Sequence, residues 1–230
     1  VVDLLIDQIE FANVLVLNKI DLVDKDSVLE LKAVLQKLNP GARIIESTHT
    51  EVALTDILDT GLFDFEEASQ GAGWIKELNE AHTPETEEYG ITSLVYRRKR
   101  PFHPERWRKW LEDWPVDVVR AKGFFWLASR NNMTGLISQA GPSIIIQGAG
   151  EWIAVYPDEE RKQILKEEPE LLERWDPEFG DRITEIVLIG VGMYRKEIEE
   201  GLDQCLLTDE EMKMDWSEFQ DQLPRFTITA

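Results

Sequence analysis

Apolar residues recur with two different periods over the first 60 positions, which predicts a helix followed by a strand. Leu4, Leu5 and Ile9 lie at helical spacing and predict the end of a helix over residues 1–11. A mostly apolar run then follows over residues 13–17. Its length and its Val and Leu content are typical of a buried strand.

A second helix and strand follow directly. Ser27 and Glu30 have the spacing of a capping box, and residues 39–41, Asn-Pro-Gly, end the helix that it opens. Residues 42–46 predict another strand, and residues 54–58 a short helix. Strand, helix and strand in this order predict a βαβ unit, whose two strands run parallel.

From residue 90 onward the pattern changes to short strands and charged helices. Pro104 stands where a helix would begin, and further helices are expected over residues 158–168 and 195–206. The predicted strands are 90–96, 122–128, 134–139, 143–147, 152–156 and 184–191. Turns rich in Gly and Asn separate several of them, so we expect an α+β fold with antiparallel pairs.

Composition sets the expected domain boundaries. Residues 71–89 are rich in acids and poor in large apolar side chains, which is typical of a linker. We therefore expect an α/β portion over residues 1–70, the linker over 71–89, an α+β domain over 90–208 and an irregular acidic tail over 209–230.

Charge narrows the classes of partner. The chain has 230 residues, 43% of them hydrophobic, and a net charge of −20 from 25 basic and 45 acidic residues. Such a charge disfavours nonspecific binding to nucleic acid or to an anionic membrane. It suits a protein that handles cations.

One cysteine and the first residues bear on the compartment. Cys205 is the single cysteine, so no intramolecular disulfide can form, and a reducing compartment such as the cytoplasm is expected. The first 17 residues include Asp3, Asp7 and Glu10 and do not resemble a signal peptide or a membrane span. Because Val1 lies within an amphipathic pattern, we expect further residues upstream.

The most specific motif is Asn-Lys-Ile-Asp at residues 18–21, directly after the first predicted strand. Ligands of open α/β sheets bind at the carboxyl ends of strands. The Asp21 carboxylate can accept two parallel N–H bonds, which guanine offers on its Watson–Crick edge and adenine does not. Asn18 would bridge the base and nearby backbone, and the stem of Lys19 would lie along the base plane. The alternative is an ordinary polar turn.

Metal ligands are sparse. His82, with Glu85, Glu87 and Glu88 nearby, could form a weak zinc site, although a single histidine in an acidic loop is usually only solvated. His103 is more simply a residue that caps the helix beginning at Pro104. Cys205 is expected to be a small buried apolar residue.

Two further clusters have competing interpretations. A basic island comprises residues 97–100, Arg106, Arg108 and Lys109. It could bind an anion or an acidic partner, or its charges could pair with neighbouring acids, which we favour. Tryptophans recur at helical spacing at residues 107, 110 and 114, and core packing is favoured over a base-stacking platform.

Several segments together resemble the CobW-like P-loop GTPases, and most closely their zinc-linked metallochaperone branch. The similar segments are residues 2–23, 84–91, 95–97, 100–106, 122–128, 180–182 and 202–208. The resemblance implies a partial parallel GTPase sheet without its N-terminal half, followed by the α+β CobW C-terminal domain, with guanine recognised by Asn18, Lys19 and Asp21.

The resemblance also implies a function. In this family GTP with Mg²⁺ is hydrolysed, and a divalent metal such as Zn²⁺ or Co²⁺ is delivered to a client protein. The chain has no Gly-x-x-x-x-Gly-Lys-Ser/Thr and no Cys-x-Cys-Cys motif, so by itself it is expected to lack GTPase activity. Alternatives are a non-catalytic protein-interaction module, or a nucleotide- or RNA-associated factor that uses the basic island.

Overall fold

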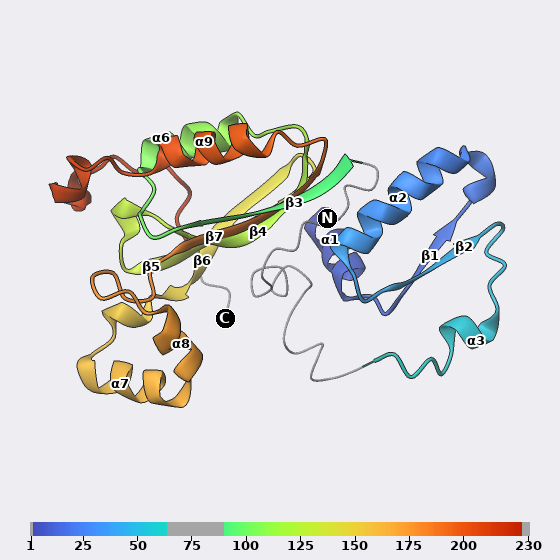
Figure 1. Cartoon of the computed structure of the whole chain (residues 1–230), viewed down its shortest axis with the longest axis horizontal. Coiled ribbons are helices and arrows are strands. Elements are labelled where there is room, and N and C mark those ends of the chain that lie inside the picture. Colours follow the sequence, from blue (N-terminus) through green and yellow to red (C-terminus); the bar gives the residue numbers. More distant parts are fainter. Residues whose placement is uncertain (1, 64–89, 227–230) are drawn as a thin grey trace. The chain divides into compact units, whose positions relative to one another are not determined.

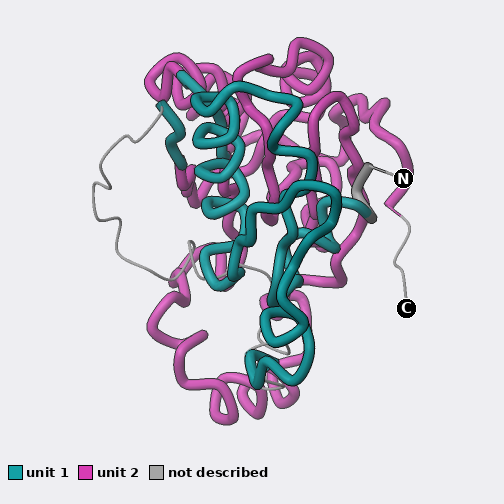
Figure 2. Tube along the Cα trace, turned by 90° about the vertical axis from the view of Figure 1, so that its right-hand side faces the viewer, with its two compact units in different colours: residues 1–93, 189–193 teal, residues 94–188, 194–230 magenta. Residues whose placement is uncertain are grey.

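The chain folds into two compact units, seen in a computed structural model that describes residues 2–63 and 90–226. One unit comprises residues 1–93 with 189–193, and the other comprises residues 94–188 with 194–230 (Figure 2). The expected linker over 71–89 lies outside the described residues. Within the described part, no helix is both long and apolar enough to cross a bilayer.

The first unit contains the predicted βαβ arrangement (Figure 1). Strands β1 and β2 are parallel, with register from Val14 opposite Arg43 to Asn18 opposite Ser47. The elements are α1 (Val2–Phe11), β1 (Val14–Asn18), the 3-10 turn η1 (Ile20–Leu22), α2 (Lys25–Leu38), β2 (Arg43–Ser47) and α3 (Leu54–Ile57). The prediction of a parallel pair joined by a helix is confirmed.

Two local expectations in this unit are wrong. Helix α2 begins at Lys25, because the Asp24 carboxylate accepts the backbone N–H of Ser27 at 2.9 Å and so forms the cap itself. Ser27 is therefore inside the first turn, and no capping box forms with Glu30. Strand β1 is half-buried, with Val16 40% exposed, although its apolar run predicts full burial.

A five-stranded sheet in the order β3-β7-β4-β5-β6 lies mostly within the second unit. Strands β4, β5 and β6 form two antiparallel pairs, as expected for an α+β domain. The strands are β3 (Ile91–Arg98), β4 (Val118–Trp126), β5 (Met133–Ala140), β6 (Ser143–Glu151) and β7 (Thr184–Val191). Helices α6 (Pro104–Glu112) and α9 (Arg195–Cys205) lie together over one face of this sheet (Figure 1).

The core of this unit lies between those two helices and the sheet. Trp107 on α6 is fully buried, and its ring stacks on Phe102 with centroids 4.6 Å apart and contacts Phe125 of β4 at 5.4 Å. Tyr96 also stacks on Phe102, with ring centroids 6.2 Å apart. Core packing therefore explains Trp107, as favoured by its helical spacing.

Residues 152–156 are not the strand that their pattern predicts. They form a 3-10 turn, η4 (Ile153–Val155), because the backbone N–H groups of Ile153 and Ala154 donate to the Asp181 carboxylate. Two helices follow, α7 (Asp158–Glu167) and α8 (Pro169–Arg174), and the second was not predicted. Pro169 is in the first turn of α8, where its missing N–H costs no hydrogen bond.

The last described residues, 209–226, form a strap along this unit. They contain two 3-10 turns, η5 (Glu211–Lys213) and η6 (Trp216–Glu218), joined by irregular backbone. They are not a free tail: Trp216 packs on Trp126 with centroids 5.9 Å apart, and Leu223 is buried. We call residues 209–226 the C-terminal strap.

Candidate functional site

The carboxyl ends of β1 and β2 lie side by side, which brings residues 18–21 next to the loop after β2. The parallel register sets Asn18 opposite Ser47, so both strands end at the same edge of the pair. Ser47 Oγ donates to the Glu51 carbonyl at 3.1 Å and draws this loop back on itself. In an α/β sheet this is the edge where ligands bind.

Asn18 binds that loop through both the nitrogen and the oxygen of its side-chain amide. Its Nδ2 donates to Thr50 Oγ1 at 3.1 Å, and its Oδ1 accepts the backbone N–H of Thr50 at 3.0 Å. The two bonds hold residues 48–50 against the end of β1. Thr50 could not be predicted from the sequence, because its spacing of 32 residues from Asn18 gives no local signal.

Left-handed backbone gathers at the same edge. Lys19, His49 and Thr50 have φ values of 65°, 55° and 63°, a region that residues other than glycine seldom occupy. The surrounding hydrogen bonds hold them there. Strain of this kind concentrates at ligand sites and switch regions, which makes this edge the leading candidate for a functional site.

Asp21 lies in η1, just beyond β1, with its carboxylate exposed. It forms no hydrogen bond or ion pair within residues 2–63 and 90–226. Lys19 is also exposed, and it accepts the Leu22 backbone N–H through its carbonyl at 3.1 Å. An acceptor-only group with no partner is what pairing with two N–H donors requires.

The proposed zinc ligands His82, Glu85, Glu87 and Glu88 all lie outside the described residues. Among those described, no three His, Cys, Asp or Glu side chains are close enough to hold a metal ion. His103 instead caps α6: its Nδ1 accepts the backbone N–H of Glu105 at 3.2 Å. Cys205 is buried, and burial raises the pKa of its thiol to about 12.

The basic island is largely paired with acids, as favoured over an anion site. Arg98 donates to both oxygens of Asp203, at 2.8 and 2.9 Å. The other pairs are Arg97 with Glu185, Lys99 with Asp176, Arg100 with Asp209, Arg106 with Glu211 and Arg108 with Glu112. Cations already engaged by carboxylates attract phosphates weakly, so the structure gives the RNA-binding alternative no support.

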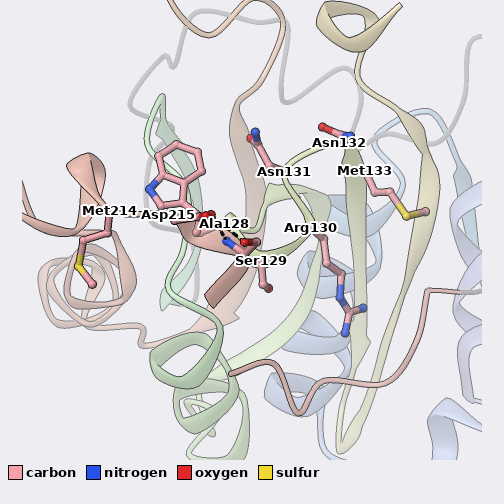
Figure 3. A pocket seen from close by; sticks show the side chains of 10 residues that line it. Ala128, Ser129, Arg130, Asn131, Asn132, Met133, Met214 and Asp215 are labelled. Carbon is pink, nitrogen blue, oxygen red and sulfur yellow. Dashed lines mark hydrogen bonds between the residues drawn. The ribbon is translucent and has the colours of Figure 1, made fainter. Parts of the chain in front are cut away.

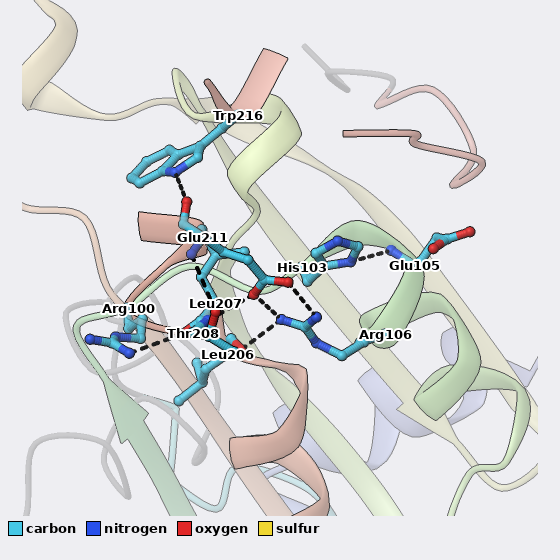
Figure 4. Close-up of polar contacts among 9 residues, drawn as sticks. All are labelled: Arg100, His103, Glu105, Arg106, Leu206, Leu207, Thr208, Glu211 and Trp216. Carbon is cyan, nitrogen blue, oxygen red and sulfur yellow. Dashed lines mark hydrogen bonds and ion pairs between the residues drawn. The ribbon is translucent and has the colours of Figure 1, made fainter. Parts of the chain in front are cut away.

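The pair of Arg106 and Glu211 joins α6 to the C-terminal strap (Figure 4). Arg106 donates to the two Glu211 oxygens at 2.8 and 2.6 Å, and Glu211 also accepts the Thr208 backbone N–H at 2.8 Å. These bonds, those from Arg106 foremost, lower the pKa of Glu211 to about 2. Burial, and then the charge of Arg106, lowers the pKa of His103.

A hollow of about 620 Å³ separates the strap from the loop before β5 (Figure 3). It is lined by residues 128–133 and 214–217, but most of its polar groups are already engaged. Ser129 and Arg130 donate to Asp221, and Asn131 accepts the Trp126 indole N–H at 2.9 Å. This hollow is therefore a gap between two packed segments of the fold, with few polar groups left to bind a ligand.

Comparison with protein families matches both parts of the chain. Residues 1–46 match the CobW/HypB/UreG nucleotide-binding domain, and residues 91–206, about half of the chain, match the cobalamin synthesis protein cobW C-terminal domain. The first match contains residues 18–21 and both parallel strands up to Glu46. The second match runs from the beginning of β3 to the end of α9. It includes the five-stranded sheet and excludes the C-terminal strap.

Individual relatives agree with these matches. The chain is 43% identical over 215 residues to zinc-regulated GTPase metalloprotein activator 1 of Dictyostelium discoideum, covering 92% of this chain and 45% of the relative. It is 29% identical over 218 residues to a zinc chaperone of Mycobacterium tuberculosis, covering 90% and 50%. The chain thus spans about half the length of the curated relatives it matches.

A solved structure from E. coli aligns over most of the chain. It is the Zn(II)-bound YjiA GTPase from E. coli, with 16% identity, a TM-score of 0.41, and coverage of 88% of this chain and 54% of that one. The assignment does not depend on this alignment. With a family model matching half of its residues and the predicted blocks in their expected order, the chain belongs to the CobW family.

Proposed function

We propose that this chain is part of a GTP-binding metallochaperone that couples GTP hydrolysis to delivery of a divalent metal, zinc, to a client protein. The names of the relatives, a zinc-regulated GTPase metalloprotein activator and a zinc chaperone, support this function. The observation that carries the nucleotide half of the proposal is the exposed Asp21 carboxylate beside a strained loop edge, with no partner among the described residues.

Guanine is the base that suits Asp21. Its ring N–H and exocyclic amine are adjacent donors, and one ionised carboxylate can accept both. Adenine presents an acceptor where guanine has the ring N–H, and a site built for specific donors rejects it strongly. Asn18 and Lys19 would contact the base. The two hydrogen bonds between Asn18 and Thr50 would hold residues 48–50 in place.

Hydrolysis requires more than this chain contains. Phosphoryl transfer needs a phosphate cradle and Mg²⁺. The sequence has no Walker A motif, and among the described residues no three His, Cys, Asp or Glu side chains gather at a possible metal site. We therefore propose that the full-length protein is the GTPase and that this chain alone is inactive.

Zinc would be the cargo and not a resident ion of the described residues. His82, with the acids after it, stays a proposed weak ligand in the segment between the two family matches. Co²⁺ is the alternative cargo. The α+β domain would contact the metal-dependent client in the cytoplasm, where reduced thiols are maintained.

The test changes one atom of the proposed base contact in the full-length protein. Asp21→Asn replaces an acceptor oxygen by an amide donor, so GTP binding should weaken by about 10- to 100-fold, which equals about 1.5–3 kcal/mol. Xanthine has a carbonyl in place of the exocyclic amine of guanine. XTP binding should therefore become stronger in the variant, measured by fluorescence titration with both nucleotides.

Asp26→Asn is the matched control, because Asp26 is an exposed acid in the first turn of α2 and the charge change is the same. It should leave both affinities unchanged. Equal GTP affinity in Asp21→Asn and the native protein would sink the guanine assignment. Unchanged client metallation without GTP would separately sink the coupling.

A further inference from the structure

A small pocket with aromatic walls lies where the end of α6 meets the beginning of α9. Its volume is about 220 Å³, below the range of about 300–1,000 Å³ typical of small-molecule sites and near the size of one long side chain. It is lined by Trp110, Pro115, Asp117, Tyr194, Glu197 and Ile198. None of these residues belongs to residues 18–21 or 48–50, to the basic island or to the C-terminal strap.

The Trp110 wall is held in place by its neighbours. Its indole stacks on buried Trp107 with centroids 5.5 Å apart and meets Trp114 edge-on at 4.8 Å. On α9, Gly201 leaves room for it, because a Cβ there would lie 2.8 Å from Trp110 Nε1. A ring fixed before binding loses little entropy when a ligand contacts it.

Two large side chains near the rim of the pocket are exposed to solvent. Tyr194, the residue that precedes α9, is 69% exposed, and Val116 in the loop after α6 is 94% exposed. Exposed aromatic and apolar side chains beside a recess are typical of interaction sites.

Two carboxylates give the pocket a negative charge. Asp117 and Glu197 are both exposed, and neither forms an ion pair or hydrogen bond within the described ranges. Lys196, one of the two cations that begin α9, is 3.6 Å from Glu200, one turn further along the helix. Unpaired acids next to aromatic rings favour a cation that can stack and donate at once.

We propose that this pocket binds an arginine side chain of a basic partner protein. A guanidinium can lie flat on Trp110 or Tyr194 and donate N–H groups to Asp117 and Glu197, which a compact ammonium cannot do equally well. The net charge of −20 would steer such a partner toward the chain and oppose a second copy of itself. The proposal depends on neither the nucleotide nor the metal.

The test follows the indole N–H of Trp110 by NMR in the ¹⁵N-labelled full chain. The probe is a blocked Gly-Ser peptide with one central arginine, compared with the same peptide carrying lysine or citrulline, a neutral isostere of arginine. Arginine should produce a saturable shift. Citrulline should bind at least about tenfold more weakly, which equals about 1.4 kcal/mol, and lysine should fall between them.

Variants separate the pocket from general attraction to an acidic surface. Asp117→Asn and Glu197→Gln should each weaken the arginine peptide about three- to tenfold, since each removes one charge-assisted hydrogen bond. Glu160→Gln, an exposed acid on α7, makes the same charge change away from the pocket and should have no effect.

The idea fails if citrulline binds as well as arginine, or if Glu160→Gln weakens binding as much as Glu197→Gln does. It also fails if Trp110 responds to protein concentration and not to the peptide, because the occupant would then be a second copy. All three acids are exposed, so these variants are expected to stay folded.

Discussion

Single side chains at the end of β1 form the candidate guanine site. Asn18 ends β1 and holds Thr50 through two hydrogen bonds, so one amide connects two loops that are distant in sequence. Asp21, three residues later, is left without a partner in the described part of the chain. The local division of roles is clear: Asn18 orders the loop, and Asp21 stays available.

Removing the Asn18 amide should loosen the loop after β2. Asn18→Ala removes both bonds, so exchange of the Thr50 backbone N–H should accelerate by about tenfold or more in hydrogen exchange. Asn18→Asp is the control, because it keeps an acceptor for that N–H and should retain most of the protection. If the Thr50 backbone N–H exchanged as slowly in Asn18→Ala as in the native protein, the proposed role of the Asn18 amide would be wrong.

His103 should make stability depend on pH. Its neutral Nδ1 caps α6, and burial, followed by the charge of Arg106, lowers its pKa below 6.5. The unfolded chain therefore binds more protons near pH 6, so stability should fall as pH decreases through 6.5 toward the folded pKa.

His103→Asn keeps an N-cap acceptor but does not titrate in this range. The free energy of unfolding in urea, followed by tryptophan fluorescence, should depend less on pH between about 5 and 7 in this variant. An unchanged slope would show that other groups cause the dependence.

At the scale of elements, a charged contact fastens helix α6 to the C-terminal strap. Arg106 reaches both oxygens of Glu211 (Figure 4). Phe219 of the strap packs against the His103 ring with centroids 4.8 Å apart. The acidic composition of the strap thus has a structural use: its carboxylates neutralise part of the basic island.

Glu211→Gln should destabilise the native chain by about 1–2 kcal/mol at pH 7, a value reduced from that of a buried charged hydrogen bond because the pair is partly exposed. Since the pKa of Glu211 is lowered from 4.5 to about 2, this contribution is present above pH 4.5 and lost as pH falls toward 2. Urea unfolding of both proteins at several pH values measures it. A difference that persists unchanged at low pH would exclude this pair as its source.

At the scale of the second unit, Arg130 anchors the far end of the strap. Its guanidinium donates to both oxygens of Asp221 and to the carbonyls of Leu223 and Pro224. It also lies 4.2 Å from the centroid of the Phe226 ring. Both charged side chains are only 15% exposed, so their pairing matters more than that of the surface ion pairs.

Asp221→Ala leaves that guanidinium largely buried without its carboxylate, and should reduce the free energy of unfolding by about 3 kcal/mol. Asp209→Ala removes an acid whose side chain is 80% exposed, and its effect should be below about 1 kcal/mol. Urea denaturation of the full chain compares the two. Equal losses would mean that the strap does not depend on the Arg130 anchor.

Short-range patterns predicted much of the fold. Strand β7 has the predicted limits, and α6 begins at Pro104 as expected, because an apolar run and a proline in the first turn are local signals. Residues 152–156 mislead for the opposite reason: a distant acid, Asp181, takes the backbone donors that a strand would use. At the start of α2 the competing acid is a local one, because Asp24 takes the cap that the Ser27 pattern predicts for Ser27.

The sequence by itself determined the family, the parallel βαβ unit, the α+β domain and the tetrapeptide that would select guanine. All of these are written in residues close together along the chain. Only the tertiary structure decided that Thr50 completes the Asn18 edge, that acids neutralise the basic island, and that the last residues are a strap. Those contacts join residues far apart in the chain, and folding alone brings them within hydrogen-bonding distance.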